Sequence, residues 1–266
     1  MAKRLEGKVA VVVGAGQTKG ETIGNGRAIA TLYAREGARL FLVDRDSESV
    51  AVTAEQIVVA GGEAEVFVAD ARQEADCEQA IQACMQHYKQ IDNLTNVVGI
   101  GTDDTSVIRI TEEVWDTMMD VNVKSVLFTC KYALPHMRAA EAGNIINISS
   151  AAALSAAGYV GYKVSKAGVN ALTHTMAMSN AKYGIRANVI MPGLLDTPMA
   201  IEGQAKARNL DRETVRAQRN ALVPLAKRMG TAWDTANAAV FLASDEAQFI
   251  TAAVLPVDGG QIGKIG

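Results

Sequence analysis

The segment YKVSKAGVNAL contains a tyrosine and a lysine four residues apart, Tyr162 and Lys166. Its apolar residues recur at helical spacing, so both side chains are expected on one face of a helix. A phenol with a pKa of ~10 is a poor base at neutral pH. Lowering that pKa to ~7 takes roughly 4 kcal/mol, about what an ammonium ~4 Å away supplies at an effective dielectric constant of ~20. The pair is therefore predicted to move a proton, with Tyr162 as the acid or base.

The same spacing occurs three residues earlier, at Tyr159 and Lys163. Spacing alone does not choose between the two registers, because each pair would share a helix face. The choice depends on the sequence around them.

A glycine-rich segment follows the short β-branched run Val9–Val13 and contains Gly14, Gly24 and Gly26, with Asn25 between the last two. After this segment the apolar residues take the spacing of a helix. A glycine loop between a strand and a helix lets a phosphate approach the backbone at the positive end of the helix dipole. This context favours a dinucleotide site over a simple turn.

The second expected strand ends in Asp44. A carboxylate at this position can accept hydrogen bonds from both ribose hydroxyls of an adenosine. A 2′-phosphate would be repelled by roughly 3 kcal/mol per unit charge at ~5 Å and an effective dielectric constant of ~20. NAD is therefore predicted as the cofactor, although Arg45 next to it could neutralise the phosphate of NADP.

These residues must be positioned by a chain that alternates between strands and helices. The expected strands are Val9–Val13, Leu40–Val43, Val66–Ala69, Leu94–Val98, Asn144–Ile148, Arg186–Ile190 and Val254–Val257. The expected helices are one from Gly26 to about Gly37, then Ser47–Ala60, Ala75–Tyr88, Thr111–Met137, Tyr159–Tyr183 and Thr231–Leu242. This alternation predicts an α/β fold, a Rossmann-type doubly wound parallel sheet of about seven strands that binds ligands at the carboxyl ends of its strands.

Composition limits the class of protein. The 266 residues are 49% hydrophobic and 21% charged, with a formal net charge of −3. This composition excludes a disordered chain and argues against a nucleic-acid partner.

We expect one dinucleotide-binding and catalytic domain over residues 1–266, in which the charged segment 194–222 is a substrate lid. No apolar run reaches the ~18 residues of a membrane span. With no cleavage signal and three cysteines in no paired pattern, the protein is expected to be cytoplasmic.

At this point the sequence resembles the short-chain dehydrogenase/reductase family, from GKVAVVVGAG to LPVDGGQ. The resemblance implies that Tyr162 is the acid or base on the substrate oxygen and that Lys166 holds the cofactor ribose and lowers the pKa of the tyrosine. It implies that a serine of INISS orients the substrate oxygen, with Ser150 favoured and Ser149 the alternative. Asn122 in MDVNVKS would complete a proton relay. The serine before Lys166 and the following SKAGVNAL match the family at Tyr162, which favours that register.

The resemblance also assigns further cofactor contacts. They are Asp70 and Ala71 on the adenine side, Asn96, and Leu195 with Thr197 at the nicotinamide amide. Two departures stand out. The family's Asn-Asn-Ala-Gly reads NVVG here, and the glycine loop carries an extra TKGETI, Thr18–Ile23, which is expected to be a cofactor-side flap or an extension of the phosphate loop.

Two other patterns of polar residues are not predicted to bind a metal or a substrate. The three histidines lack metal-ligand spacing, so no metal is predicted. Arg208, Arg212, Arg216 and Arg219 form a stripe on one helix face, which could meet an anionic substrate but is better explained as a solvated face of the lid.

The resulting hypothesis is an NAD-dependent oxidoreductase that interconverts a small-molecule secondary alcohol and a ketone by hydride transfer. One alternative is an NADPH-dependent ketone reductase of the ketoacyl type, against which Asp44 argues. Another is a non-catalytic dinucleotide-binding sensor, for which a damaged set of serine, tyrosine and lysine is expected. The resemblance also implies a homotetramer.

Overall fold

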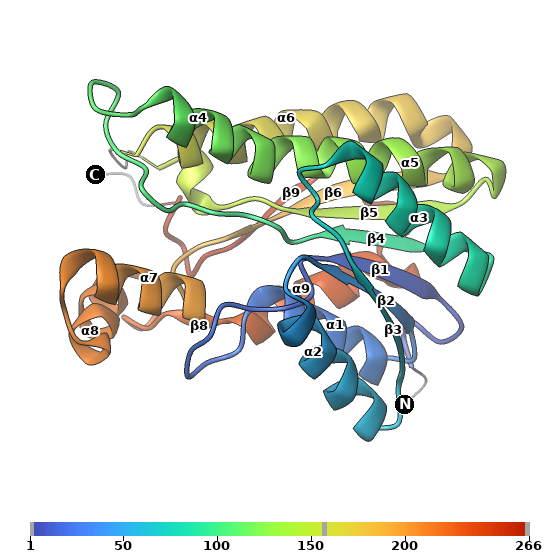
Figure 1. Ribbon diagram of the computed structural model, residues 1–266, viewed down its shortest axis with the longest axis horizontal. Coiled ribbons are helices and arrows are strands. Elements are labelled where there is room, and N and C mark those ends of the chain that lie inside the picture. The colour runs from blue at the N-terminus through green and yellow to red at the C-terminus, as the bar shows by residue number, and fades with distance from the viewer. Residues whose placement is uncertain (1–2, 156–158, 264–266) are drawn as a thin grey trace.

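The computed structural model describes residues 3–155 and 159–263, and within them it contains a seven-stranded parallel sheet (Figure 1). The strands are β1 (Val9–Val13), β2 (Arg39–Asp44), β3 (Glu63–Val68), β4 (Asn93–Asn96), β5 (Gly143–Ile148), β6 (Ile185–Pro192) and β9 (Val254–Val257). Their order in the sheet is β3-β2-β1-β4-β5-β6-β9, and every neighbouring pair is parallel. The predicted doubly wound sheet is confirmed.

Helices cover both faces of this sheet (Figure 1). One face carries α1 (Asn25–Arg35), α2 (Ser47–Val59) and α9 (Ala232–Ala243), and the other carries α3 (Glu74–Tyr88), α4 (Glu112–Met119), α5 (Ser125–Ala139) and α6 (Gly161–Asn180). Each helical layer packs on its own core of buried apolar side chains. The central strand β1 is buried along its whole length, as expected for a β-branched run between two layers.

Two predicted helices differ from the structure at points that matter for the site. The sequence predicts one helix over Thr111–Met137, but a π-helical segment, Asp120–Lys124, separates α4 from α5. Such single turns of π-helix inside α-helices often occur at functional sites. The helix expected to begin at Tyr159 begins at Gly161, so Tyr159 precedes it and is 60% exposed.

Close backbone contacts at two glycines set the geometry where the strand order reverses, between β1 and β4. Gly14 has φ +86°, and a Cβ there would lie 2.9 Å from the amide nitrogen of Val98 in the loop after β4. A Cβ on Gly26 would lie 1.8 Å from the carbonyl oxygen of Gly14. Only glycine at position 26 lets α1 begin this close to the loop, which brings the helix N-terminus to the carboxyl end of the sheet.

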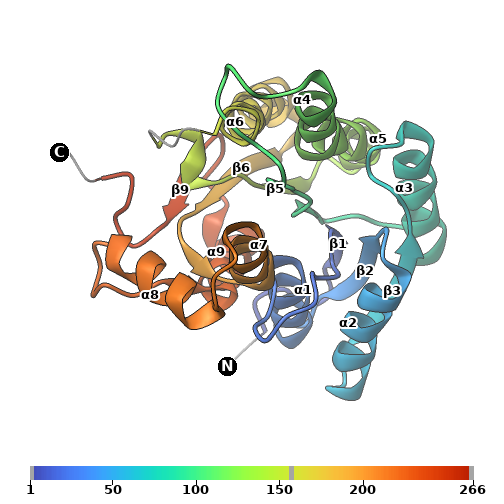
Figure 2. The same cartoon turned by 60° about the vertical axis from the view of Figure 1, so that its left-hand side comes forward.

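The segment that the sequence predicts as a lid contains two helices, α7 (Pro198–Arg208) and α8 (Arg212–Leu222), after the two-residue strand β7 (Leu195–Asp196). This strand pairs with β8 (Gly230–Thr231). Figure 2 shows α7 and α8 at one end of the sheet, apart from the helices that cover its faces. They share a small apolar cluster of Ile201, Val215, Val223 and Met229. The assignment of this segment as a substrate lid stays a prediction.

Over the described ranges, no helix combines the length and the apolar character needed to cross a membrane. The same residues contain no cluster of three or more histidine, cysteine or carboxylate side chains that could hold a metal ion. The three cysteines are buried and free.

Replacing Gly26 with alanine tests the close approach of α1. The new methyl group would overlap the carbonyl oxygen of Gly14, so we expect Gly26→Ala to lower the free energy of unfolding by about 1–3 kcal/mol. The matched control is Gly203→Ala in α7, where a Cβ meets nothing within 4 Å and alanine should add about 0.5–1 kcal/mol through its helix propensity. Urea unfolding measures both variants, and equal stabilities would contradict the packing described here.

Candidate active site

The predicted tyrosine and lysine lie in the first two turns of α6. The ammonium of Lys166 lies 5.8 Å from the ring centroid of Tyr162. Ser150, which follows β5, lies close enough to the hydroxyl of Tyr162 to influence its pKa. Burial raises the pKa of Tyr162, and the nearby Ser150 side chain opposes that rise. The lowering expected from Lys166 is not found in this structure, in which burial dominates and favours the protonated phenol.

Lys166 is only 2% exposed and is held by the end of β5. Its Nζ donates a hydrogen bond to the carbonyl of Ile148 at 3.0 Å. A Cβ on Gly99 would lie 2.8 Å from Nζ, so this glycine leaves the space that the ammonium occupies. Burial lowers the pKa of Lys166 to about 8. An ammonium has three donors, and one is used here, so the others can meet a ligand.

The two serines of INISS have different partners. Ser149 is 3% exposed, and its hydroxyl donates to the backbone carbonyl of Lys166 at 2.9 Å. Ser150 accepts a hydrogen bond from the amide of Ala152 and lies close enough to the phenol of Tyr162 to influence its pKa. The serine side chain beside the Tyr162 hydroxyl is therefore that of Ser150, whereas Ser149 bonds the backbone of α6.

The two registers of the tyrosine and lysine pair are also distinguished. The ammonium of Lys163 donates to the backbone carbonyl of Ser155, away from Lys166. Tyr159 lies before the helix and is largely exposed. The neighbouring Ser150 and the buried lysine both belong to the pair at 162 and 166, which supports the predicted register.

Asn122 lies in the π-helical segment and is fully buried. Its Oδ1 accepts from the amide of Ile100 at 2.8 Å, and its Nδ2 donates to the carbonyl of Ile100 and to the hydroxyl of Ser165, each at 2.9 Å. A Cβ on Gly99 would lie 3.5 Å from Oδ1 as well as against Lys166. The structure thus brings Asn122 close to Lys166, and the asparagine fixes the loop after β4.

The glycine loop has the features of an anion site. Gly24 precedes α1 and offers no side-chain cap, so N–H groups of the first turn remain available. The Oδ1 atom of Asn25 is buried without a hydrogen-bond partner, but because it is an acceptor it does not itself favour an anion. Gly14 and Gly26 leave a concave backbone surface that a Cβ would fill. These observations fit the diphosphate of a dinucleotide.

Two residues that support the loop were missed by sequence reasoning. Gln17 Oε1 accepts from the amide of Gly24 at 2.9 Å, and Ser49 Oγ accepts from the amide of Gln17 at 2.8 Å. Polar side chains near a glycine-rich turn are the only sequence signal for such contacts, and that signal is weak because these side chains are common in loops.

Asp44 is positioned at the loop, as predicted. Its carboxylate accepts from the amides of Gly16 at 2.8 Å and Asp46 at 3.0 Å. A carboxylate has about four lone-pair positions, so two remain for ribose hydroxyls. Arg45 is exposed beside it.

Asp70 and Asn96 are committed to partners within the chain. Arg72 pairs with the carboxylate of Asp70 and holds the pKa of that group below its usual range. The side chain of Asn96 points into the sheet layer, where it donates to Asn147 at 2.9 Å and accepts from Thr129 at 2.8 Å. The structure therefore does not bring the Asn96 side chain to the cofactor region. The predicted contacts at positions 70 and 96 could be made by backbone groups.

Three predicted cofactor residues lie near the termini of short elements. Ala71 follows Asp70 and is 7% exposed, while Leu195 in β7 and Thr197 before α7 are 5% and 8% exposed. Thr197 makes no side-chain cap to α7, so its hydroxyl is not committed to that helix.

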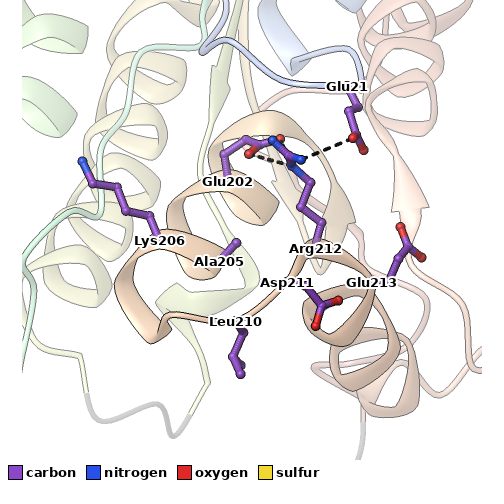
Figure 3. A pocket seen from close by; sticks show the side chains of 8 residues that line it. All are labelled: Glu21, Glu202, Ala205, Lys206, Leu210, Asp211, Arg212 and Glu213. Carbon is purple, nitrogen blue, oxygen red and sulfur yellow. Dashed lines mark hydrogen bonds and ion pairs between the residues drawn. The ribbon is translucent and has the colours of Figure 1, made fainter.

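The extra segment Thr18–Ile23 contacts the predicted lid. Glu21 pairs with Arg216 at 3.1 Å and with Arg212 at 3.5 Å. A hollow of about 490 Å³ opens between Glu21 and the helices α7 and α8 (Figure 3). Arg212 bonds both Glu21 and Glu202 beside it. The lining of the hollow is strongly charged and contains none of the predicted catalytic residues, so this hollow is not the reaction site.

The arginine stripe is only partly the solvated helix face that the sequence predicts. Arg208 ends α7, whereas the other three arginines lie in α8, and Arg208 and Arg212 are exposed. Arg216 is bonded to Asp196 and Glu213 as well as Glu21, and its side chain is 16% exposed. Arg219 is 7% exposed and donates to the carbonyl of Leu195 at 3.4 Å. Apart from Glu213, these partners are distant in the sequence, so a helical spacing pattern cannot show them.

Comparisons with known proteins agree with this fold and site. The family model described as Enoyl-(Acyl carrier protein) reductase matches residues 20–261. The chain is 37% identical over 256 residues to 2-(R)-hydroxypropyl-CoM dehydrogenase of Xanthobacter autotrophicus, covering 95% of this chain and 97% of that protein. It is 33% identical over 260 residues to the 3-oxoacyl-(acyl-carrier-protein) reductase of Thermotoga maritima, covering 97% and 99%.

Solved structures are similar to this protein over nearly its whole length. A Burkholderia xenovorans protein assigned to the short-chain dehydrogenases/reductases superposes with a TM-score of 0.90 at 37% identity over the whole of both chains. Carveol dehydrogenase from Mycobacterium avium, in complex with NAD, superposes with a TM-score of 0.91 at 27% identity over 98% of this chain and 100% of that one. The chain belongs to the short-chain dehydrogenase/reductase family.

The buried ammonium has a measurable effect on stability. Folded Lys166 has a pKa of about 8 and the unfolded residue 10.5. Below pH 8 both states are protonated, and the folded state bears the desolvation cost. Between pH 8 and 10.5 the unfolded state binds more protons, so stability should rise with pH by up to about 3 kcal/mol.

Lys166→Met removes this dependence. We expect the variant to be more stable than the unmodified protein at pH 7 and to lose that advantage as the pH rises from 8 to 10.5. Denaturant unfolding at a series of pH values measures the difference, with Lys163→Met as the matched control. Parallel stability curves for Lys166→Met and the unmodified protein would show that the ammonium is not desolvated.

Proposed function

We propose that this protein is an NAD-dependent oxidoreductase that interconverts a secondary alcohol and a ketone. The observation that carries the proposal is the arrangement of Ser150, Tyr162 and Lys166 at the carboxyl ends of the strands, with Ser150 beside the buried phenol and the lysine buried one turn further along α6. The names of several relatives point to the same chemistry, including levodione reductase and 7alpha-hydroxysteroid dehydrogenase.

The residues present fit a nicotinamide dinucleotide. The open first turn of α1, Gly14 and Gly26 would hold the diphosphate, Asp44 the adenosine ribose, and Lys166 the second ribose. Leu195 and Thr197 would lie near the amide. When bound, the nicotinamide supplies the carbon that accepts or donates the hydride.

The side chains of the chain control the substrate oxygen and its proton. Ser150 and Tyr162 would both hydrogen-bond that oxygen and so orient the carbon that reacts. Because burial raises the pKa of Tyr162, the phenol is protonated at neutral pH and can donate its proton to the oxygen of a ketone. Lys166, cationic below a pH of about 8, would stabilise the phenolate left behind. In the oxidative direction the phenolate of Tyr162 would take the hydroxyl proton, after the phenol has released its own proton to solvent.

The alternatives differ in cofactor or in class. An NADPH-dependent ketoacyl-type reductase is supported by the similarity to 3-oxoacyl-(acyl-carrier-protein) reductase and by the exposed Arg45. The position of Asp44 at the glycine loop supports NAD instead. A non-catalytic sensor is disfavoured because the serine, tyrosine and lysine are intact and in contact.

We further propose a homotetramer in the cytoplasm. Exposed apolar side chains on α5 and α6, including Leu127 and Met178, and Phe249 near the last strand would be covered by other copies of the chain. The buried, free cysteines suit a reducing compartment.

Cofactor preference tests the role of Asp44. We expect a higher kcat/KM with NAD than with NADP, because the carboxylate favours two hydroxyls and repels a phosphate. Asp44→Ala should weaken NAD binding and relieve the rejection of NADP. Its neighbour Asp46→Ala is the control, because that carboxylate caps α2. Equal kcat/KM values for both cofactors in the unmodified protein would favour the NADPH alternative and a role for Arg45.

Two conservative variants test the catalytic assignment. Tyr162→Phe removes one oxygen and should lower kcat by at least ~10²-fold, as expected for loss of a general acid or base, with cofactor binding almost unchanged. Tyr159→Phe should change KM at most. Oxidation and reduction of the cofactor with a panel of alcohols and ketones measures both, and a reversed order of severity at saturating NAD would move the assignment to Tyr159 and Lys163.

A further inference from the structure

Helix α6, which carries Tyr162 and Lys166, begins without a capping side chain of its own. The residue before it is Val160, whose side chain offers no hydrogen-bond acceptor, and the first N–H groups of a helix have no partner within the helix. A carboxylate from a distant part of the chain supplies the hydrogen-bond acceptor that these N–H groups lack. Asp104, in the loop after β4, lies 58 residues before Tyr162 in the sequence.

The carboxylate of Asp104 accepts hydrogen bonds from consecutive amides at the start of α6. Its Oδ1 accepts from Val160 at 3.3 Å and from Gly161 at 3.0 Å, and its Oδ2 accepts from Tyr162 at 2.7 Å. Oδ1 also accepts from the amide of Thr105 at 2.8 Å. A negative charge is favourable at this end of a helix because the helix dipole is positive there.

The loop that carries Asp104 is fixed at its other end as well. Asn122 bonds both the amide and the carbonyl of Ile100. Between these two anchors, a Cβ on Gly101 would lie 3.3 Å from the ring of Tyr162, so the loop backbone lies against the phenol ring. The loop therefore contacts Tyr162 at its amide and at its ring, while Ser150 lies beside its hydroxyl.

Gly161 lets α4 pack closely against the start of α6. A Cβ there would lie 2.8 Å from the sulfur of Met118 in α4, whereas its distance of 3.4 Å from Asp104 Oδ1 would be an ordinary contact. The first turn of α6 is thus enclosed by the loop on one side and by α4 on the other.

We propose that Asp104 is a positioning residue that sets the place of the Tyr162 phenol by holding the amide of the same residue. This inference rests on the proposed function of Tyr162 as acid and base. A shift of the first turn of α6 would move the hydroxyl away from Ser150 and from the substrate oxygen, without touching the cofactor contacts at α1 and Asp44.

The test compares Asp104→Ala with Asp103→Asn. The control changes the neighbouring exposed carboxylate, which has φ +61°, a conformation that asparagine tolerates. Asp104→Ala should lower kcat by about 10²-fold, because a misplacement of ~1 Å has an effect of that size. The Kd of NAD should change little. Asp103→Asn should leave both quantities unchanged.

A double variant separates positioning from a general loss of structure. In the Tyr162→Phe background, Asp104→Ala should have little further effect on the residual kcat, because both changes act through one hydroxyl. An effect as large as in the unmodified protein, or an equal loss of NAD affinity and kcat, would overturn the proposal.

Amide hydrogen exchange gives a readout that does not depend on turnover. Asp104→Ala should lose protection at Gly161 and Tyr162 and keep it in the later turns of α6. Unchanged protection would overturn the proposal even if the activity falls. If the unmodified protein binds NAD but turns over no alcohol or ketone, the proposed function fails, and the exchange result still decides whether Asp104 holds this turn.

Discussion

The burial of one ammonium group, that of Lys166, constrains the arrangement of the active site. Taking this charge out of water costs about 3 kcal/mol at neutral pH, judged from the lowering of its pKa from 10.5 to about 8. The surrounding residues are arranged to hold it. Ile148 accepts a hydrogen bond from its Nζ, Ser149 bonds its backbone carbonyl, and Gly99 leaves the space that it fills. A charge kept at this cost is expected where it serves a reaction.

The same fold brings the other groups to this ammonium. The reversal of strand order between β1 and β4 opens two loops at one edge of the sheet, and both loops depend on glycines where backbones meet. The loop after β1 carries the region that fits a diphosphate. The loop after β4 fixes Tyr162 through Asp104 and is itself fixed by Asn122. Ion pairs of Glu21 then join the first loop to α8, so the cofactor side and the predicted lid are connected.

The sequence predicted those features that depend on local pattern. Inner strands such as β1 and β2 were predicted because strands buried on both faces must be continuously apolar, and the pair at 162 and 166 was predicted because helical periodicity places it on one face. Features that depend on distant contacts were not predicted. The π-helical segment around Asn122 differs from an α-helix in its backbone hydrogen bonds, which apolar spacing alone did not indicate. The inward orientation of Asn96 and the capping by Asp104 each depend on partners more than thirty residues away in the sequence.

The central claim is that Tyr162 and Ser150 together hold the oxygen that gains or loses a proton. The most direct test is a crystal structure of the protein with NAD and a ketone or alcohol that it turns over slowly. The account predicts that the ligand oxygen lies within about 3.2 Å of both Tyr162 Oη and Ser150 Oγ, with Lys166 Nζ on the ribose. A ligand oxygen bound at Tyr159 or Ser149, with the Tyr162 hydroxyl directed elsewhere, would contradict it.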